Sequence, residues 1–225
     1  MTQLDYNVSN ITHSQTAVMD TNKVLRNTYL LLSMTLLFSA VTAGVSMALN
    51  LGHGVGLILL LVSFGLMFWV NRAADSAMGL VAVFVFTGCM GAALGPVLNH
   101  YLAFPRGPSL IFEALGGTAL VFLGLSGYAL TTKKDFSFMQ GFLTTGLIVM
   151  LVGGLVLMFT DMPTVSLAWS AMIVLLMSGL ILFDTSRIIH GGETNYIRAT
   201  VGLYLSIYNM FTSLLHLLGA FGGDE

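Results

Sequence analysis

Two residues of this sequence have the types that nucleophilic catalysis requires. Ser126 lies in the short motif Gly124-Leu125-Ser126-Gly127, and His216 lies in an apolar stretch near the end of the chain. A serine becomes a nucleophile when an imidazole within about 3 Å takes its proton, so this pair has the composition of a serine hydrolase. Whether the two side chains can meet depends on the elements that carry them.

The composition of the chain decides what kind of elements these are. Of its 225 residues, 56% are hydrophobic and 8% are charged. Soluble domains contain about 25% charged residues, so the composition excludes an ordinary soluble protein and indicates an all-α membrane protein. Each apolar segment is close to the ~20 residues that cross the hydrocarbon core. We predict seven such segments, at roughly 28–49, 53–71, 77–99, 108–130, 139–159, 165–187 and 200–221.

The rest of the chain is short and polar. We predict one seven-helix transmembrane domain over residues 28–221, a disordered cytoplasmic N-terminal tail over residues 1–27, and a short external C-terminal tail over residues 222–225. The loops leave no room for a soluble domain. The single cysteine, Cys89, excludes an internal disulfide and a cysteine-based metal cluster.

The basic residues predict the orientation of the chain. In the seven-segment topology, seven of the eight lie on one side, which the positive-inside rule places in the cytoplasm. The N-terminus is then cytoplasmic and the C-terminus external. The seven residues are Lys23, Arg26, Arg72, Lys133, Lys134, Arg187 and Arg198, and Arg106 is the one on the other side.

This topology separates the serine from the histidine. Ser126 comes late in a segment that runs inward, whereas His216 comes late in a segment that runs outward. At 1.5 Å of rise per residue, their depths differ by roughly 15–20 Å. The pair cannot meet, so we predict that the protein is not an enzyme. His190 and Glu193 share one loop, and two candidate ligands there do not make a metal site. We therefore expect neither a cofactor nor a metal.

The last segment carries polar residues along its whole length. Spacings of four, three, four and three place them on one face of a helix, and a second polar row lies beside it. Unpaired polar groups are costly in hydrocarbon, so we predict that other helices surround this one. The stripe either holds helices together or also lines a polar path, and both readings stay open. The stripe is Gly202, Ser206, Asn209, Ser213 and His216; the second row is Tyr204, Tyr208 and Thr212.

A carboxyl group lies near the inner end of this stripe. Asp184 is about one turn from the cytoplasmic end of the sixth segment, near the level of Ser206. An ionisable residue at this depth is a candidate for function. Arg72 and Arg187 lie at the same membrane face, where they serve as interfacial anchors or as counter-ions for Asp184. Asp184, Ser206 and Arg72 are therefore our candidate residues for an ion path.

Several separated motifs now agree, in order and spacing, with one family. The chain resembles the Bax inhibitor-1 family of membrane proteins, and within it the bacterial YccA-like branch, to which residues 189–200 are especially similar. The motifs that carry the resemblance are Gly95-Pro96, Phe122–Phe138, Asp184, Tyr196–Ala199, Leu203–Leu205 and Asn209–Phe211.

The resemblance implies a fold of six helices around a central seventh. It also implies calcium ions as a candidate partner. Some members of the family act as a pH-gated calcium leak whose sensor is a pair of aspartates on the sixth and seventh helices. The first of these positions corresponds to Asp184, but the second is Ser206 here. Two close carboxylates titrate as a unit, and a serine cannot supply the second charge. We therefore expect any such leak to be weakened or altered.

The YccA-like branch implies a different role. Its members associate with the membrane-anchored AAA protease FtsH, both as substrates and as modulators of its activity. An accessible polar end such as residues 1–27 suits a protease that begins at an unfolded terminus. Our leading hypothesis is a multi-pass protein of the bacterial inner membrane that binds and modulates FtsH. The alternative is a pH-sensitive calcium or cation leak. We expect membrane lipid as a partner, and no nucleic acid.

Overall fold

The computed structural model describes residues 3–157, 159–160 and 162–222, with side chains described from residue 21 onward. Within this part of the chain the protein is all-α, and seven helices are long and apolar enough to cross a membrane. The prediction of seven spans is therefore confirmed. The helices are α1 (Gln3–Ala48), α2 (His53–Ala73), α3 (Met78–Leu102), α4 (Gly107–Thr132), α5 (Gln140–Leu157), α6 (Pro163–Ile189) and α7 (Tyr196–Gly222), with a short 3-10 helix η1 (Ser137–Met139) before α5.

Local signals explain where several helices begin and end. Prolines lie in the first turns of α4 and α6, where a missing N–H costs no hydrogen bond. Lys133 follows α4 with a φ of 51°, a left-handed conformation that ends a helix. The last helix begins at Tyr196, four residues before the predicted boundary, because Asn195 caps it.

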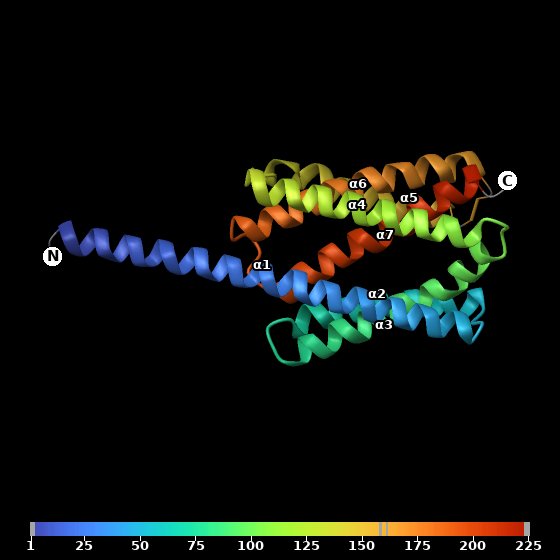
Figure 1. Ribbon diagram of the computed structural model, residues 1–225, viewed down its shortest axis with the longest axis horizontal. Helices are drawn as coiled ribbons and strands as arrows, with labels where there is room; N and C mark the ends of the chain where they lie inside the picture. Colours follow the sequence, from blue (N-terminus) through green and yellow to red (C-terminus); the bar gives the residue numbers. More distant parts are fainter. Residues whose placement is uncertain (1–2, 158, 161, 223–225) are drawn as a thin grey trace.

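The first helix is longer than its membrane span. The span is Thr21–Ala48, and helical backbone continues back to Gln3. The division of the chain into a tail over residues 1–27 and a membrane domain over residues 28–221 stays a prediction. The sequence offers nothing to stop the helix, because the first glycine of the chain is Gly44 and the first proline is Pro96. Figure 1 shows this N-terminal part of α1 projecting alone beyond the other helices. The predicted C-terminal tail lies almost entirely outside the described residues.

The helices form two groups with α7 between them (Figure 1). In one group α3 packs against α1 and α2, and in the other α6 packs against α4 and α5. The helix α7 contacts α1, α2, α3, α4 and α6, whereas α5 contacts only α6 and η1 among the described elements. The two groups therefore meet through α7, and also directly where α1 contacts α6 and α3 contacts α4.

Small residues bring α1 and α3 close together. A Cβ atom at Gly91 would collide with the main-chain oxygen of Ser39, and one at Gly95 would collide with the side chain of Ser46. The Oγ atom of Ser46 donates a hydrogen bond to the main-chain oxygen of Ala92, at 2.7 Å. This is the close packing that the spacing of Gly91 and Gly95 indicates.

Candidate functional site at the interface of α6 and α7

Asp184 lies near the C-terminal end of α6, half-buried, and its carboxylate is directed at Gly202 of α7. A Cβ atom added at Gly202 would lie 2.9 Å from the Oδ2 atom of Asp184. The glycine therefore leaves the space that the carboxylate fills. Gly202 is also the first member of the polar stripe, so the stripe begins at the acidic side chain.

The predicted counter-ions have other places in the structure. The Nη2 atom of Arg187 lies 3.4 Å from the Oε2 atom of Glu193, and its guanidinium group lies over the ring of Phe183, 5.6 Å from the centroid. Arg72 is exposed in the last turn of α2. Among the described residues, neither arginine forms an ion pair with Asp184.

Ser206 is buried one turn beyond Gly202 on the same face of α7, with 2% of its surface exposed. The structure has no hydrogen bond between Ser206 and Asp184 within the described part of the chain. A carboxylate at position 206 would lie on the face of α7 that meets Asp184, but serine adds no charge there.

The outer part of the stripe also meets protein. Ser213 is 5% exposed, and Asn209 is half-buried, donating from Nδ2 to the main-chain oxygen of Leu205 at 2.8 Å. The Nδ1 atom of His216 lies 2.8 Å from the Oγ atom of Ser170 in α6. The α6–α7 interface therefore contains polar groups from Asp184 at one end to Ser170 at the other. The role of these groups as an ion path stays a prediction.

The first residue of the second polar row of α7, Tyr204, contacts both α1 and α3. The hydroxyl groups of Tyr204 and Ser39 lie 2.7 Å apart, and Tyr204 also donates to the main-chain oxygen of Thr87 at 3.4 Å. Tyr204 is 1% exposed. Thr212 donates to the main-chain oxygen of Tyr208, one turn earlier in α7, at 3.1 Å. The hydroxyls of Tyr204 and Thr212 are thus satisfied within the protein, and Tyr204 helps to hold α1 on α7.

Ser126 and His216 have different partners. The Oγ atom of Ser126 lies 3.5 Å from the Oγ1 atom of Thr185 in α6, and Thr185 lies at the same distance from the hydroxyl of Tyr29. His216 instead contacts Ser170, fifteen residues earlier in α6 than Thr185. At 1.5 Å per residue the two sites are roughly 20 Å apart along that helix, so the pair cannot act together.

The loop histidine has a structural partner. The Nδ1 atom of His190 lies 2.9 Å from the main-chain oxygen of Ser186. No group of three or more metal-ligating side chains occurs in the residues that were described.

One cluster escaped the sequence analysis. Asn195 accepts hydrogen bonds at Oδ1 from the main-chain N–H groups of Ile197 and Arg198, and its Nδ2 donates to Ala74 and Asp75. Arg198 also pairs with Asp75, with Nη2 and Oδ2 2.6 Å apart. The cluster ties the α2–α3 loop to the start of α7. An asparagine directly before a helix was the signal that could have revealed the cap.

A second contact holds the α4–α5 loop. The main-chain N–H of Phe136 donates to the Oγ atom of Ser186, which donates to the main-chain oxygen of Lys134. In the same loop, hydrogen bonds from Ser137 lower the pKa of Asp135. The three loops that precede α3, α5 and α7 therefore lie at one end of the bundle.

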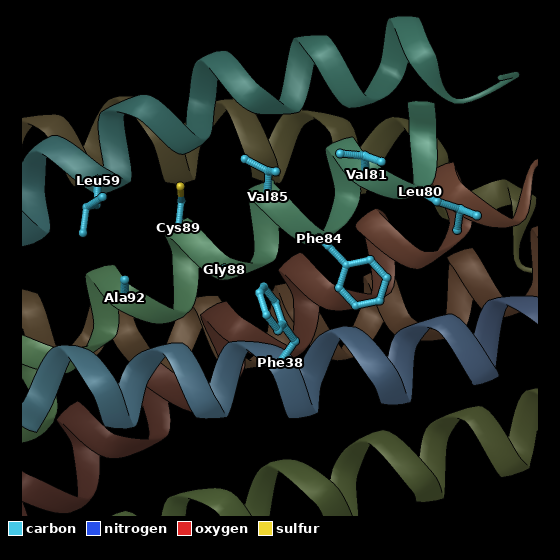
Figure 2. A pocket seen from close by; sticks show the side chains of 9 residues that line it. All are labelled: Phe38, Leu59, Leu80, Val81, Phe84, Val85, Gly88, Cys89 and Ala92. Atoms are coloured by element: carbon cyan, nitrogen blue, oxygen red, sulfur yellow. The ribbon is translucent and has the colours of Figure 1, made fainter. Parts of the chain in front are cut away.

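An apolar hollow lies on α3. Figure 2 shows Cys89 and Val85 of α3 directed toward α2, and Phe38 of α1 directed toward α3. Its lining is hydrocarbon apart from the thiol of Cys89, which is half-buried. This lining provides no group that could bind a polar ligand or perform catalysis.

Comparison with known proteins places this arrangement in a family. The model of the family described as "Inhibitor of apoptosis-promoting Bax1" matches residues 21–223, which is nearly the whole chain. The chain belongs to the Bax inhibitor-1 family. This confirms the resemblance drawn from the motifs, and with the seven apolar helices it makes the chain a multi-pass membrane protein.

Relatives from several bacteria match this Bax inhibitor-1 protein over almost their full length. It is 54% identical over 208 residues to "Modulator of FtsH protease YccA" of Escherichia coli K12, which covers 92% of this chain and 94% of the relative. It is 52% identical over 215 residues to an uncharacterised membrane protein of Vibrio cholerae, with 95% and 96% covered. The same Escherichia coli match in another strain bears the name "Inner membrane protein YccA". Of these names, that of the Escherichia coli K12 relative describes a protease modulator.

Proposed function

We propose that this protein is a multi-pass inner-membrane protein that binds and modulates the membrane protease FtsH. The observation that carries the proposal is the 54% identity, over 92% of the chain, to a relative named for that role. The family match over residues 21–223 spans all seven membrane helices and both loops tied by Asn195 and Ser186.

We further propose that the N-terminus is cytoplasmic and the C-terminus external. Arg198 contacts Asp75, and Ser186 contacts Lys134. These contacts bring the C-terminal ends of α2, α4 and α6 together at one face of the bundle. This supports one basic face that includes Arg72, Lys133 and Arg187, with Arg106 at the opposite end, and such a face belongs in the cytoplasm.

The family arrangement of six helices around a central α7 is part of this proposal. Its support is that α7 packs against five of the other six helices, while α5 reaches the bundle through α6. Under this arrangement Asp184, Ser206 and the outer stripe residues Asn209, Ser213 and His216 are kept away from lipid.

The projecting part of α1 is the segment that we propose the protease engages. It lies at the basic end of the bundle and extends beyond the other helices (Figure 1). A single helix without packing partners is marginally stable, because most helix stability in proteins comes from tertiary contacts. Such a segment can be unwound without disturbing the seven-helix core.

The experiment is reconstitution with purified FtsH in liposomes. We expect the full chain to co-purify with the protease and to slow cleavage of a membrane substrate, and we expect a variant lacking residues 2–20 to lose this effect while keeping its fold. A variant in which the same residues are replaced by an unrelated helix of equal length is the matched control. Absence of binding by the full chain would contradict the proposal.

A second candidate function is a cation leak of the Bax inhibitor-1 type through the Asp184 region. One observation favours it: this half-buried carboxylate has no hydrogen bond or ion pair among the described residues, which is unusual for a purely structural acid at membrane depth. Calcium flux into dye-loaded liposomes tests it. Flux that depends on pH and vanishes in Asp184→Asn would support the leak, and flux unchanged by Asp184→Asn would oppose a role for this site.

A further inference from the structure

A groove separates α1 from α4. Both helices pack against α7, and among the described residues they meet through the rings of Tyr29 and Phe122, whose centroids lie 6.1 Å apart. The space between them has a volume of about 480 Å³, with α7 and α3 as its floor. Residues that form the floor and inner walls include Ala43, Leu94, Thr118, Tyr204 and Phe211.

The groove opens sideways rather than toward either membrane face. Its rim residues Ala40 and Gly44 on α1, and Leu115, Ala119 and Leu123 on α4, are exposed, whereas the inner residues are buried. Both helices are long and apolar enough to span a membrane. The opening therefore lies at the depth of the hydrocarbon core, where lipid chains are the solvent.

The lining selects for an apolar occupant. Most of the lining side chains are hydrocarbon, and the hydroxyls of Ser39 and Tyr204 bond each other at 2.7 Å. Thr118 donates to the main-chain oxygen of Ala114, also at 2.7 Å. These groups need no partner from a ligand, and a water molecule requires two to four polar partners that such walls do not offer. The Tyr208 hydroxyl makes no hydrogen bond to any described residue, which gives a way to detect a polar occupant.

We propose that this groove holds one hydrocarbon chain of a membrane phospholipid. The volume falls within the ~300–1,000 Å³ of known small-ligand sites. Lipid and protein interior are equally apolar, so the gain on binding is close van der Waals contact rather than the hydrophobic effect. A flexible acyl chain that enters from the side makes van der Waals contacts with the atoms of the inner walls. The inference is independent of FtsH.

The test uses full-length protein in liposomes that contain a phospholipid with a photoreactive group midway along one acyl chain. After illumination, the labelled peptides are identified by mass spectrometry. We expect labelling concentrated on the groove segments of α1 and α4. Labelling spread equally over α1, α4 and the lipid-exposed helix α5 would overturn the proposal, because that pattern describes unspecific surrounding lipid.

A rim substitution makes the test specific. A Cβ atom at Gly44 meets nothing within 4 Å, so Gly44→Leu can be accommodated and should narrow the entrance. We expect it to lower groove labelling by about an order of magnitude, as a loss of ~1.4 kcal/mol in binding would. Gly65→Leu on α2, where a Cβ also meets nothing, is the matched control and should leave the labelling unchanged. Equal labelling in both variants would contradict the inference.

Two outcomes identify other occupants. If Tyr208→Phe abolishes labelling of the groove, the occupant forms a hydrogen bond with the Tyr208 hydroxyl and is not an acyl chain. If a photoreactive amino acid placed at Ala119 cross-links to a second polypeptide instead of lipid, a transmembrane helix fills the groove. A second rim variant, Ala119→Phe on the α4 side, should repeat the effect of Gly44→Leu and guards against a misfolded single variant.

Discussion

His216 of α7 and Ser170 of α6 form a hydrogen-bonded pair, with Nδ1 and Oγ 2.8 Å apart. Ser170 is close enough to the main-chain oxygen of Ser166, at 3.1 Å, to donate its single proton there while it accepts from the imidazole N–H. The histidine that looked like a catalytic partner for Ser126 thus joins two helices at the other end of the bundle.

A double-mutant cycle should measure this pair. We expect Ser170→Ala and His216→Phe to be less damaging together than the sum of their separate effects, with a coupling free energy of about 0.6–1.7 kcal/mol, as found for polar pairs between membrane helices. Unfolding in mixed micelles provides the measurement. Ser178→Ala is the control, because Ser178 donates to the main-chain oxygen of Val174 in its own helix. A coupling near zero would show that the pair contributes no stability.

The contact between Gly202 and Asp184 gives a second prediction. Gly202→Ala should destabilise the protein by about 1 kcal/mol, because the added Cβ would lie 2.9 Å from Oδ2 of Asp184 and the carboxylate must shift to admit it. The double variant Gly202→Ala with Asp184→Ala should recover most of this loss. Gly116→Ala on α4, where a Cβ meets nothing within 4 Å, should be neutral or stabilising. The unfolding free energies of the four proteins decide the matter.

The cap at Asn195 gives a third prediction. Asn195→Ala removes two hydrogen bonds to the start of α7 and two to the α2–α3 loop, so we expect a loss of about 1–2 kcal/mol. Asn195→Asp keeps the capping oxygen but loses the Nδ2 donor, so its stability should lie between that of the unchanged protein and that of Asn195→Ala. Arg198→Ala should cost less than ~1 kcal/mol, because its ion pair with Asp75 is exposed. Faster hydrogen exchange in the first turn of α7 would locate the effect. An Arg198→Ala loss larger than that of Asn195→Ala would contradict this ranking.

Asp135 gives a prediction about pH. Hydrogen bonds from Ser137 lower the pKa of Asp135 in the folded protein below its ordinary value of 3.8. A lowered folded pKa adds stability that is present above the unfolded pKa and disappears as the pH falls through the folded pKa. Asp135→Asn should therefore lower the melting temperature slightly at pH 7 and make no difference at the most acidic pH at which the protein still folds. A difference that grows on acidification would contradict the assignment.

The sequence alone determined the fold class and the family. In a membrane, the backbone polar groups of an apolar segment of about twenty residues must be satisfied within the segment itself. Such a segment therefore forms a helix whichever helices pack beside it. The polar stripe on α7 was equally readable, since helical spacing assigns residues to a face without reference to any partner. The separation of Ser126 from His216 also followed from the chain direction of two spans.

Only the tertiary structure decided which groups meet across helices. Ser170 as the partner of His216, Gly202 rather than Ser206 as the surface against Asp184, and the link from Asn195 to Asp75 depend on the rotation and depth of separate helices. A single sequence does not fix the rotation or the depth of a membrane helix, because many orientations bring apolar side chains to the lipid equally well. The open space between α1 and α4 is likewise a property of how four helices pack, and the sequence of neither helix predicts it.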